Sequence, residues 1–249
     1  MEESKIYGQQ DFNLPHDVVK LPSQGLFYKD DKKSVKVGYL TAQDENYIIN
    51  SAKNGNFINV IVKNKVYEPN FNVNELLEGD IEAILLFLRN TSFGSDYTYK
   101  LLDPVTNKTF ETTIRLDEVD FKKLNHQPNK DGHFEFNLPK SNYNVVCKLL
   151  NYGEISELLE IENKYPEGII PPTVTNRLQK QIISIDGEKN PETLSKIIMS
   201  LPIMDSKFLR NTLRECEPKL DLERTVIAPS GEKVTFNVTF GVEFFRPFF

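Results

Sequence analysis

The sequence predicts an α+β protein of two small modules, each with strands, a β-hairpin and two or more amphipathic helices. Three observations support this class. Apolar residues recur at helical spacing, β-patterned runs lead into helix-start signals, and two proline-containing turns precede alternating β-formers. The 249 residues suffice for two modules. The segment 125–132 is rich in Pro, Gly, Asn and charge, which predicts a boundary near residue 128 and modules 1–128 and 129–249.

Two strand-to-helix corners echo one another along the chain. They are Leu21-Pro22-Ser23 followed by 35–45, and Leu138-Pro139-Lys140-Ser141 followed by 145–154. Thr41 and Asp44 have the spacing of a capping box, in which each side chain serves a free amide of the first helical turn. The echo fits either an internal duplication or two ordinary strand-to-helix corners.

The spacing of apolar residues predicts three helices. The first has Leu77, Ile81, Ile84, Leu85 and Leu88 on one face behind an acidic start, with Arg89 near its C-terminal end. The second begins with Asn190 as cap and Pro191 at the first position, and it stops at Pro202. The third starts at Asp205 and carries Leu209, Leu213 and Cys216 on one face.

The third predicted helix also carries a basic stripe. Lys207, Arg210 and Arg214 lie on its other side. The stripe fits a solvated face, and it also fits an acidic partner, including the acidic segment 154–162 of the same chain.

Two turn segments predict hairpins. Residues 102–108 and 228–233 each combine proline with Asn or Gly and are followed by alternating β-formers. No cysteine pair occupies either turn, so we expect no zinc there and no metal site.

Composition excludes several classes of function. The net charge of −6 and a pI near 5.3 oppose nucleic-acid binding. The longest wholly apolar run, 83–88, is too short to cross a bilayer, and the N-terminus lacks a signal-peptide pattern. Cys147 and Cys216 form no disulfide framework. We therefore expect a soluble intracellular protein in a reducing compartment.

Catalytic motifs are absent from the sequence. There is no G-x-S-x-G elbow, phosphate loop, dinucleotide fingerprint or H-E-x-x-H, and the only three histidines include two in a loop-like stretch. We expect no catalytic residues and no cofactor.

Aromatic residues provide the candidate binding site. Five of the last ten residues are phenylalanine. A terminus this aromatic is held either by the chain's own core, as a last strand, or by a partner. Adjacent residues on a strand face opposite sides, so one sheet cannot cover both Phe244 and Phe245. The candidate partner-binding residues are Phe244, Phe245, Arg246, Pro247, Phe248 and Phe249, with Leu26, Phe27 and Tyr28 near the start.

Five ordered segments resemble the T4-type bacteriophage baseplate hub assembly proteins. They are 21–28, 40–45, 88–97, Leu138-Pro139 and 244–247, and the resemblance runs from about residue 14 to the end. It implies a late viral protein in the host cytoplasm of an infected bacterium, where it helps other hub proteins to assemble. Relatives carry cysteine pairs at the two hairpin turns, which this sequence lacks, so no metal-dependent role is implied.

Two roles remain open for such a protein. The leading hypothesis is an assembly chaperone, with the C-terminal aromatics as anchors and Arg246 orienting the contact. The alternative is a permanent structural subunit of the hub in the virion baseplate. An enzyme acting on peptidoglycan or a nucleotide would need a cleft of converging carboxylates or a phosphate loop.

Overall fold

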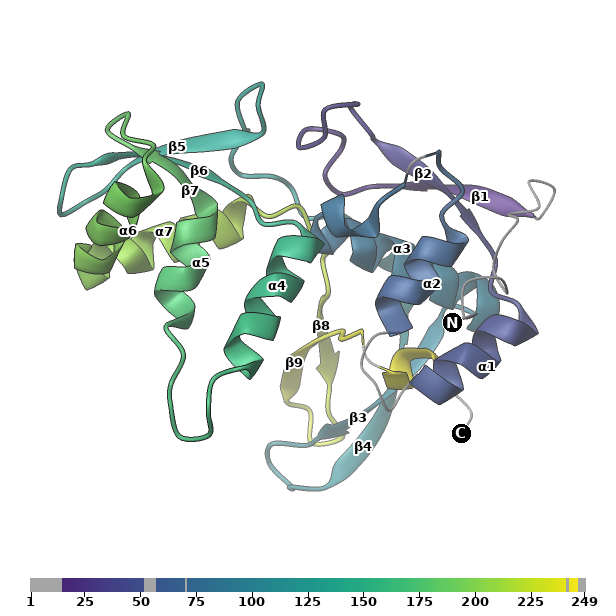
Figure 1. The fold of residues 1–249 in the computed structure, drawn as a ribbon. Helices are drawn as coiled ribbons and strands as arrows, with labels where there is room; N and C mark the ends of the chain where they lie inside the picture. Colours follow the sequence, from purple (N-terminus) through teal and green to yellow (C-terminus); the bar gives the residue numbers. More distant parts are fainter. Residues whose placement is uncertain (1–14, 52–56, 70, 241, 246–249) are drawn as a thin grey trace.

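The protein combines helices with small antiparallel sheets, which confirms the predicted α+β class (Figure 1). The computed structural model describes residues 15–51, 57–69, 71–240 and 242–245. We call the elements between residues 16 and 118 the N-terminal half and those between residues 133 and 216 the C-terminal half. The last hairpin follows the C-terminal half.

The N-terminal half begins with a hairpin and ends with another. Its elements are β1 (His16–Lys20), β2 (Ser34–Gly38), α1 (Ala42–Ser51), α2 (Phe57–Lys65), the 3-10 turn η1 (Val73–Glu75), α3 (Glu78–Phe93), β3 (Asp96–Leu102), β4 (Thr109–Arg115) and the 3-10 turn η2 (Leu116–Glu118). An isolated bridge from Val66, just after α2, adds a third segment beside β2.

The C-terminal half repeats much of this order. Its elements are β5 (His133–Asn137), β6 (Asn144–Lys148), α4 (Tyr152–Asn163), α5 (Thr173–Gln181), β7 (Ile182–Ile185), α6 (Pro191–Ser200) and α7 (Ile203–Cys216). The last hairpin, β8 (Glu223–Ile227) and β9 (Lys233–Asn237), is followed by the 3-10 turn η3 (Val242–Phe245). Strand β7 directly follows α5 and pairs with β6, as Val66 follows α2 and bridges to β2.

Local signals account for the helix starts. The Thr41 amide donates to Asp44 Oδ2 at 2.7 Å, and the Asp44 amide donates to Thr41 Oγ1 at 3.4 Å, which confirms the predicted capping box. A full capping box also joins Asn151 and Glu154 at the start of α4. The predicted helices at 77–88 and 190–201 are confirmed as α3 and α6.

One predicted helix start needs correction. Helix α7 begins at Ile203, two residues before the predicted start, so Asp205 lies inside its first turn. The carboxylate of Asp205 accepts hydrogen bonds from a distant turn and does not cap its own helix.

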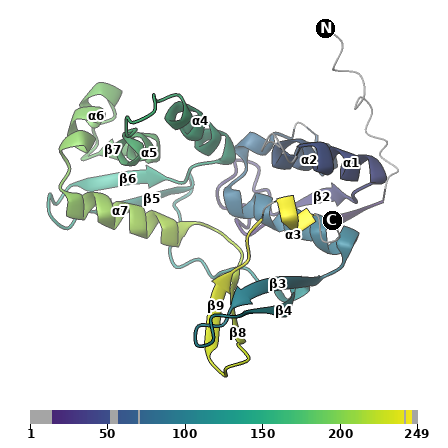
Figure 2. The same cartoon turned by 90° about the horizontal axis from the view of Figure 1, so that it is seen from below.

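Two hydrophobic cores divide the molecule. The first is built from β1, β2 and α1 to α3, and it also takes in Leu220, Val238, Phe244 and Phe245 from the end of the chain. The second lies around the sheet β5-β6-β7, with α7 on one face and α4, α5 and α6 on the other (Figure 2). The division at residue 128 remains a prediction, and residues after α7 pack with the first core.

The two later hairpins lie side by side (Figures 1 and 2). The ring centroids of Tyr99 on β3 and Phe236 on β9 are 4.7 Å apart. Each hairpin also carries a cross-strand threonine pair, Thr98 with Thr113 and Thr225 with Thr235. Both predicted hairpins are therefore present, and they support each other as well as the first core.

Candidate partner-binding surfaces

The last described residues form a tight turn and not the expected strand. In η3, Phe244 is 1% exposed and Phe245 is 2% exposed, and their rings meet at right angles with centroids 5.3 Å apart. A 3-10 turn does not send adjacent side chains to opposite faces, so one core covers both rings. Phe244 and Phe245 therefore belong to the chain's own core, as one of the two alternatives expected. Neither ring lies at the surface.

Phe244 closes an aromatic cage around a buried arginine. The Arg89 Cζ atom lies 5.8 Å from the Phe244 ring centroid and 5.4 Å from those of Phe93 and Tyr97. Arg89 Nη1 donates to the Gly94 carbonyl at 2.6 Å, and burial lowers the pKa of Arg89. Cation–π contacts and carbonyl acceptors thus hold this buried charge and tie the chain end to α3.

The other terminal candidates cannot be placed in the same way. Arg246, Pro247, Phe248 and Phe249 lie outside the described residues. Their role as partner-binding residues remains a prediction.

The second candidate segment lies between the two cores. The Phe27 ring centroid is 6.0 Å from that of Phe134 in the second core, and Leu26 is 38% exposed. The Tyr28 hydroxyl donates to Asp80 Oδ2 and accepts from the Leu77 amide. Phe27 packs against the second core and Tyr28 against both cores, which leaves Leu26 as the most exposed of the three.

A buried aspartate holds a proline-containing turn in each half. Asp80 Oδ1 accepts from the Ser23 amide at 2.9 Å. Asp205 accepts from the amides of Lys140 and Ser141 at 2.8 and 2.9 Å. Each aspartate is the third residue of its helix and is fully buried. We call these two arrangements the aspartate clamps.

A third aspartate, Asp103, joins the turns of the two later hairpins, in which no cysteine occurs. Asp103 accepts from the amides of Val105 and Thr106 in its own turn and from the Ser230 amide in the other, at 2.9, 3.1 and 3.0 Å. Burial opposes ionisation of Asp103, but these hydrogen bonds outweigh it and hold its pKa below the ordinary value. Hydrogen bonds to one carboxylate therefore link the turns.

Comparison with known proteins identifies the family. The model of the family described as T4 bacteriophage base plate protein matches residues 18–246. The chain belongs to this base plate protein family. No curated protein and no solved structure matches it. The family match confirms the resemblance to T4-type baseplate proteins and supports baseplate proteins as its partners.

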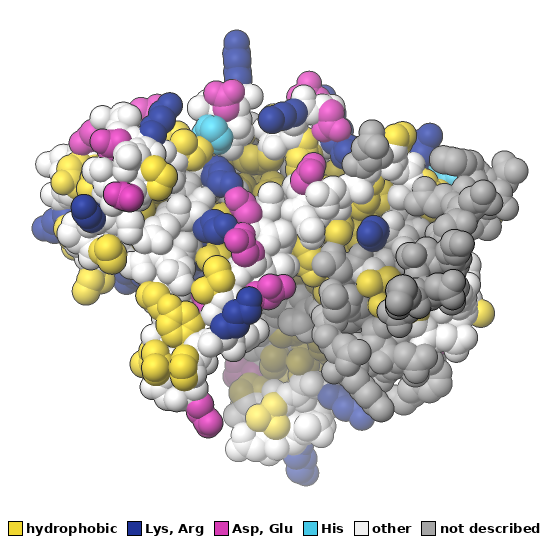
Figure 3. Space-filling model, in the orientation of Figure 1, with side chains coloured by type: hydrophobic (Ala, Val, Ile, Leu, Met, Phe, Trp, Pro, Cys, Tyr) yellow, Lys and Arg dark blue, Asp and Glu magenta, His cyan; other side chains and the backbone are white. Residues whose placement is uncertain are grey.

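An exposed apolar loop of this base plate protein was not predicted from its sequence. Large apolar side chains with more than a third of their surface exposed gather at the ends of α4 and α5 and on the loop between them, where Figure 3 shows a cluster of hydrophobic side chains. They are Leu159, Ile161, Tyr165, Ile169, Ile170 and Val174, and we call them the α4–α5 loop patch. Ile170 is 91% exposed. The available signal was an Ile-Ile pair between Gly168 and two prolines.

The base plate protein also has a polar hollow where its two halves meet. Glu78, Glu82 and Glu217 line a volume of about 210 Å³ together with Lys122 and Lys219. Burial raises the pKa of Glu82 to about 7 and that of Glu217 above its ordinary value. The described residues include no group of three or more His, Cys, Asp or Glu side chains placed to hold a metal ion. None of the described helices has the length and apolar character needed to cross a membrane.

Proposed function

We propose that this base plate protein is a non-enzymatic assembly factor that binds hub subunits through the α4–α5 loop patch. Six large apolar side chains exposed within residues 159–174 carry the proposal. Figure 3 shows hydrophobic side chains gathered at this loop, and exposed apolar patches are typical of protein-binding sites. The buried position of Phe244 and Phe245 moves the contact away from these two rings.

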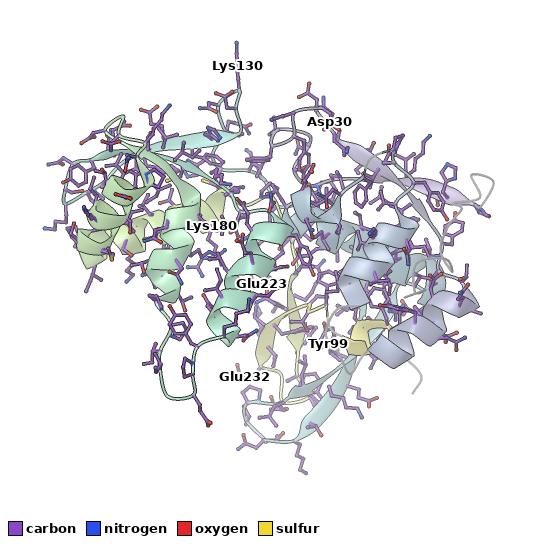
Figure 4. The ribbon with its side chains drawn as sticks, viewed as in Figure 1. Asp30, Tyr99, Lys130, Lys180, Glu223 and Glu232 are labelled. Atoms are coloured by element: carbon purple, nitrogen blue, oxygen red, sulfur yellow. The ribbon has the colours of Figure 1, made fainter. Side chains whose placement is uncertain are left out.

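The shape of the loop suits a transient contact. The patch spans the end of α4, a loop with three prolines and the start of α5, and Figure 1 shows the loop extending from the body of the C-terminal half. Lys180 on α5 reaches back toward α4 (Figure 4), where its Nζ lies 2.6 Å from Glu157 Oε2. Prolines and this ion pair restrict the loop before binding, which lowers the entropy lost on docking. We infer that the protein works in the cytoplasm of the infected bacterium, without nucleic acid.

The test replaces the most exposed pair of the patch. The Ile169→Ser/Ile170→Ser double variant should remain folded, because both side chains face solvent, and should lose hub assembly in infected cells that lack the wild-type protein. Leu102→Ser/Ile227→Ser is the matched control, since these two side chains are 54% and 70% exposed on the hairpins. Normal hub assembly with the folded Ile variant would contradict the proposal.

Two further measurements separate the alternative roles. Mass spectrometry of purified particles should find the protein far below a fixed ratio to the hub subunits; a fixed ratio would indicate a permanent structural subunit. Glu82→Gln removes the proton-binding carboxylate with the most raised pKa in the polar hollow. This variant should support normal assembly. If the variant keeps its fold but does not support assembly, an acid–base enzyme would be favoured.

A further inference from the structure

A second hollow concentrates positive charge on this acidic protein. It has a volume of about 440 Å³ and lies between α7 and the segment that follows η2. Its cations are Lys122, Lys123, Arg214 and Lys219, and its carboxylates are Glu215 and Glu217. Four cations and two carboxylates leave a local excess of positive charge, whereas the whole chain has a net charge of −6. We call this site the basic hollow.

The cations of the basic hollow are poorly neutralised. Among the described residues, the only ion pair within 4.0 Å that includes one of them joins Lys122 to Asp221, at 3.9 Å. Lys219 Nζ donates to the Arg214 carbonyl, and Arg214 Nη2 donates to Asn211 Oδ1. Neutral acceptors orient these side chains and leave their charge available to a ligand.

The positive surface continues along α7. Lys207 and Arg210 are exposed and lie about two turns and one turn before Arg214 on the same side of the helix. The acidic helix α4 does not neutralise this stripe, since it lies on the other face of the sheet and its Glu157 pairs with Lys180 (Figures 2 and 4). Within the described residues, neither Lys207 nor Arg210 forms an ion pair within 4.0 Å. The acidic segment of the same chain is therefore not the partner of the stripe.

The polar hollow shares Lys122 and Lys219 with the basic hollow, but not Lys123 or Arg214. Glu217 also lines both hollows, and Glu78 and Glu82 line only the polar one. Because burial raises the pKa of Glu82 to about 7, this carboxyl is only partly ionised at neutral pH. Glu217 also faces Arg177, whose Nη2 lies 3.8 Å from its Oε1.

We propose that the basic hollow and the α7 stripe bind an acidic segment of a partner polypeptide. Carboxylate side chains of the segment would pair with Lys123, Arg214 and the α7 stripe, and the amides of Asn125 and Asn211 would bind its peptide groups. A short acidic segment contacts only the cations of the hollow and the stripe, whereas a continuous phosphate backbone would extend over the rest of this net acidic surface. This site is separate from the α4–α5 loop patch, and the inference does not depend on the proposed assembly role.

The test measures binding of the purified full chain to a fluorescent oligoglutamate peptide by anisotropy at low salt. Wild-type protein should bind, with affinity that falls as salt is added. The Lys123→Glu/Arg214→Glu variant should bind about tenfold more weakly or worse, because two attractive contacts become repulsive. Both side chains are exposed, and circular dichroism and the melting temperature of the variant establish that the fold persists.

The matched control is Lys108→Glu/Lys233→Glu. It makes the same change in net charge at exposed positions on the two hairpins and should bind like wild type. Equal weakening in both double variants, or absence of wild-type binding, would overturn the inference. The inference would also be overturned if an oligonucleotide of equal charge displaced the peptide more effectively than unlabelled oligoglutamate. A further contradicting result would be release of the peptide at high protein concentration because the protein self-associates through this site.

Discussion

The two halves of this base plate protein share a plan but complete their cores differently. Each begins with a hairpin whose proline-containing turn is held by a buried aspartate in the first turn of a later helix. Each also has a capped helix after that hairpin, and a two-stranded hairpin follows its last helix. The second core is formed almost entirely by the C-terminal half, whereas the first also needs residues from the end of the chain.

This difference explains the aromatic chain end. An isolated hairpin is marginally stable in water, and β3–β4 gains stability by packing against β8–β9. The turn η3 then returns to α3 and covers the cage around Arg89. The aromatic terminus thus joins the last segment of the chain to the N-terminal half.

The largest expected effect comes from opening this contact. Phe244→Ala should cost about 3–5 kcal/mol of unfolding free energy, because it leaves a cavity in the first core and uncovers Arg89. Hydrogen exchange should show the loss of protection mainly in α3 and β3. Equilibrium denaturation would measure the total change.

Leu213→Ala is the matched change in the second core, where Leu213 is fully buried on α7. It should cost about 2–5 kcal/mol and reduce protection mainly in the C-terminal half. If both variants lose protection evenly over the whole chain, the two cores unfold as one unit and the distinction between them fails.

The aspartate clamps give the next largest effect. Asp80→Ala should cost about 3 kcal/mol, since the buried Ser23 amide and the Tyr28 hydroxyl lose their acceptor where water has little access. Asp205→Ala should cost about 2 kcal/mol, because the turn around Lys140 is partly exposed and water can replace the carboxylate. Urea denaturation measures both, and a larger loss for Asp205→Ala would reverse the comparison.

Local sequence signals predicted the parts of the fold that depend on neighbouring residues. The Thr41–Asp44 capping box, the apolar face of α3 and the Asn190-Pro191 start of α6 each arise within a few residues, so spacing and side-chain chemistry were enough. The turn chemistry of both hairpins was predicted for the same reason.

Long-range contacts explain what the sequence did not predict. The clamps join residues 57, 64 and 65 positions apart, so Asp205 could only be read as a local helix start. A last strand was one of the two alternatives for the terminal phenylalanines, because nothing in the local pattern specifies a 3-10 turn beneath a distant arginine. The exposed Ile169-Ile170 pair was missed because sequence spacing alone does not give solvent exposure.

The clamps also differ in the cause of their pKa shifts. Burial raises the pKa of Asp80 above its ordinary value of 3.8, in spite of hydrogen bonds from Ser23 and Tyr28. Burial also opposes ionisation of Asp205, but the hydrogen bonds from the Lys140 and Ser141 amides outweigh it and lower the pKa. In the folded state the Asp80 carboxyl therefore retains its proton more readily, and the Asp205 carboxyl loses its proton more readily.

The smallest expected effect is an opposite pH response of the two clamps, measured on Asp80→Asn and Asp205→Asn. The Asp80 carboxyl binds its proton more tightly when folded, so its contribution to stability falls as pH rises from 3.8 toward the raised pKa. The Asp205 contribution is present above 3.8 and is lost as pH falls through the lowered pKa. Urea midpoints should be measured from below the lowered pKa of Asp205 to above the raised pKa of Asp80. As pH rises toward 3.8, Asp205→Asn should fall further behind wild type, and as pH rises above 3.8, Asp80→Asn should gain on wild type. Parallel pH profiles would mean that the shared clamp geometry, and not the difference in environment, governs both aspartates.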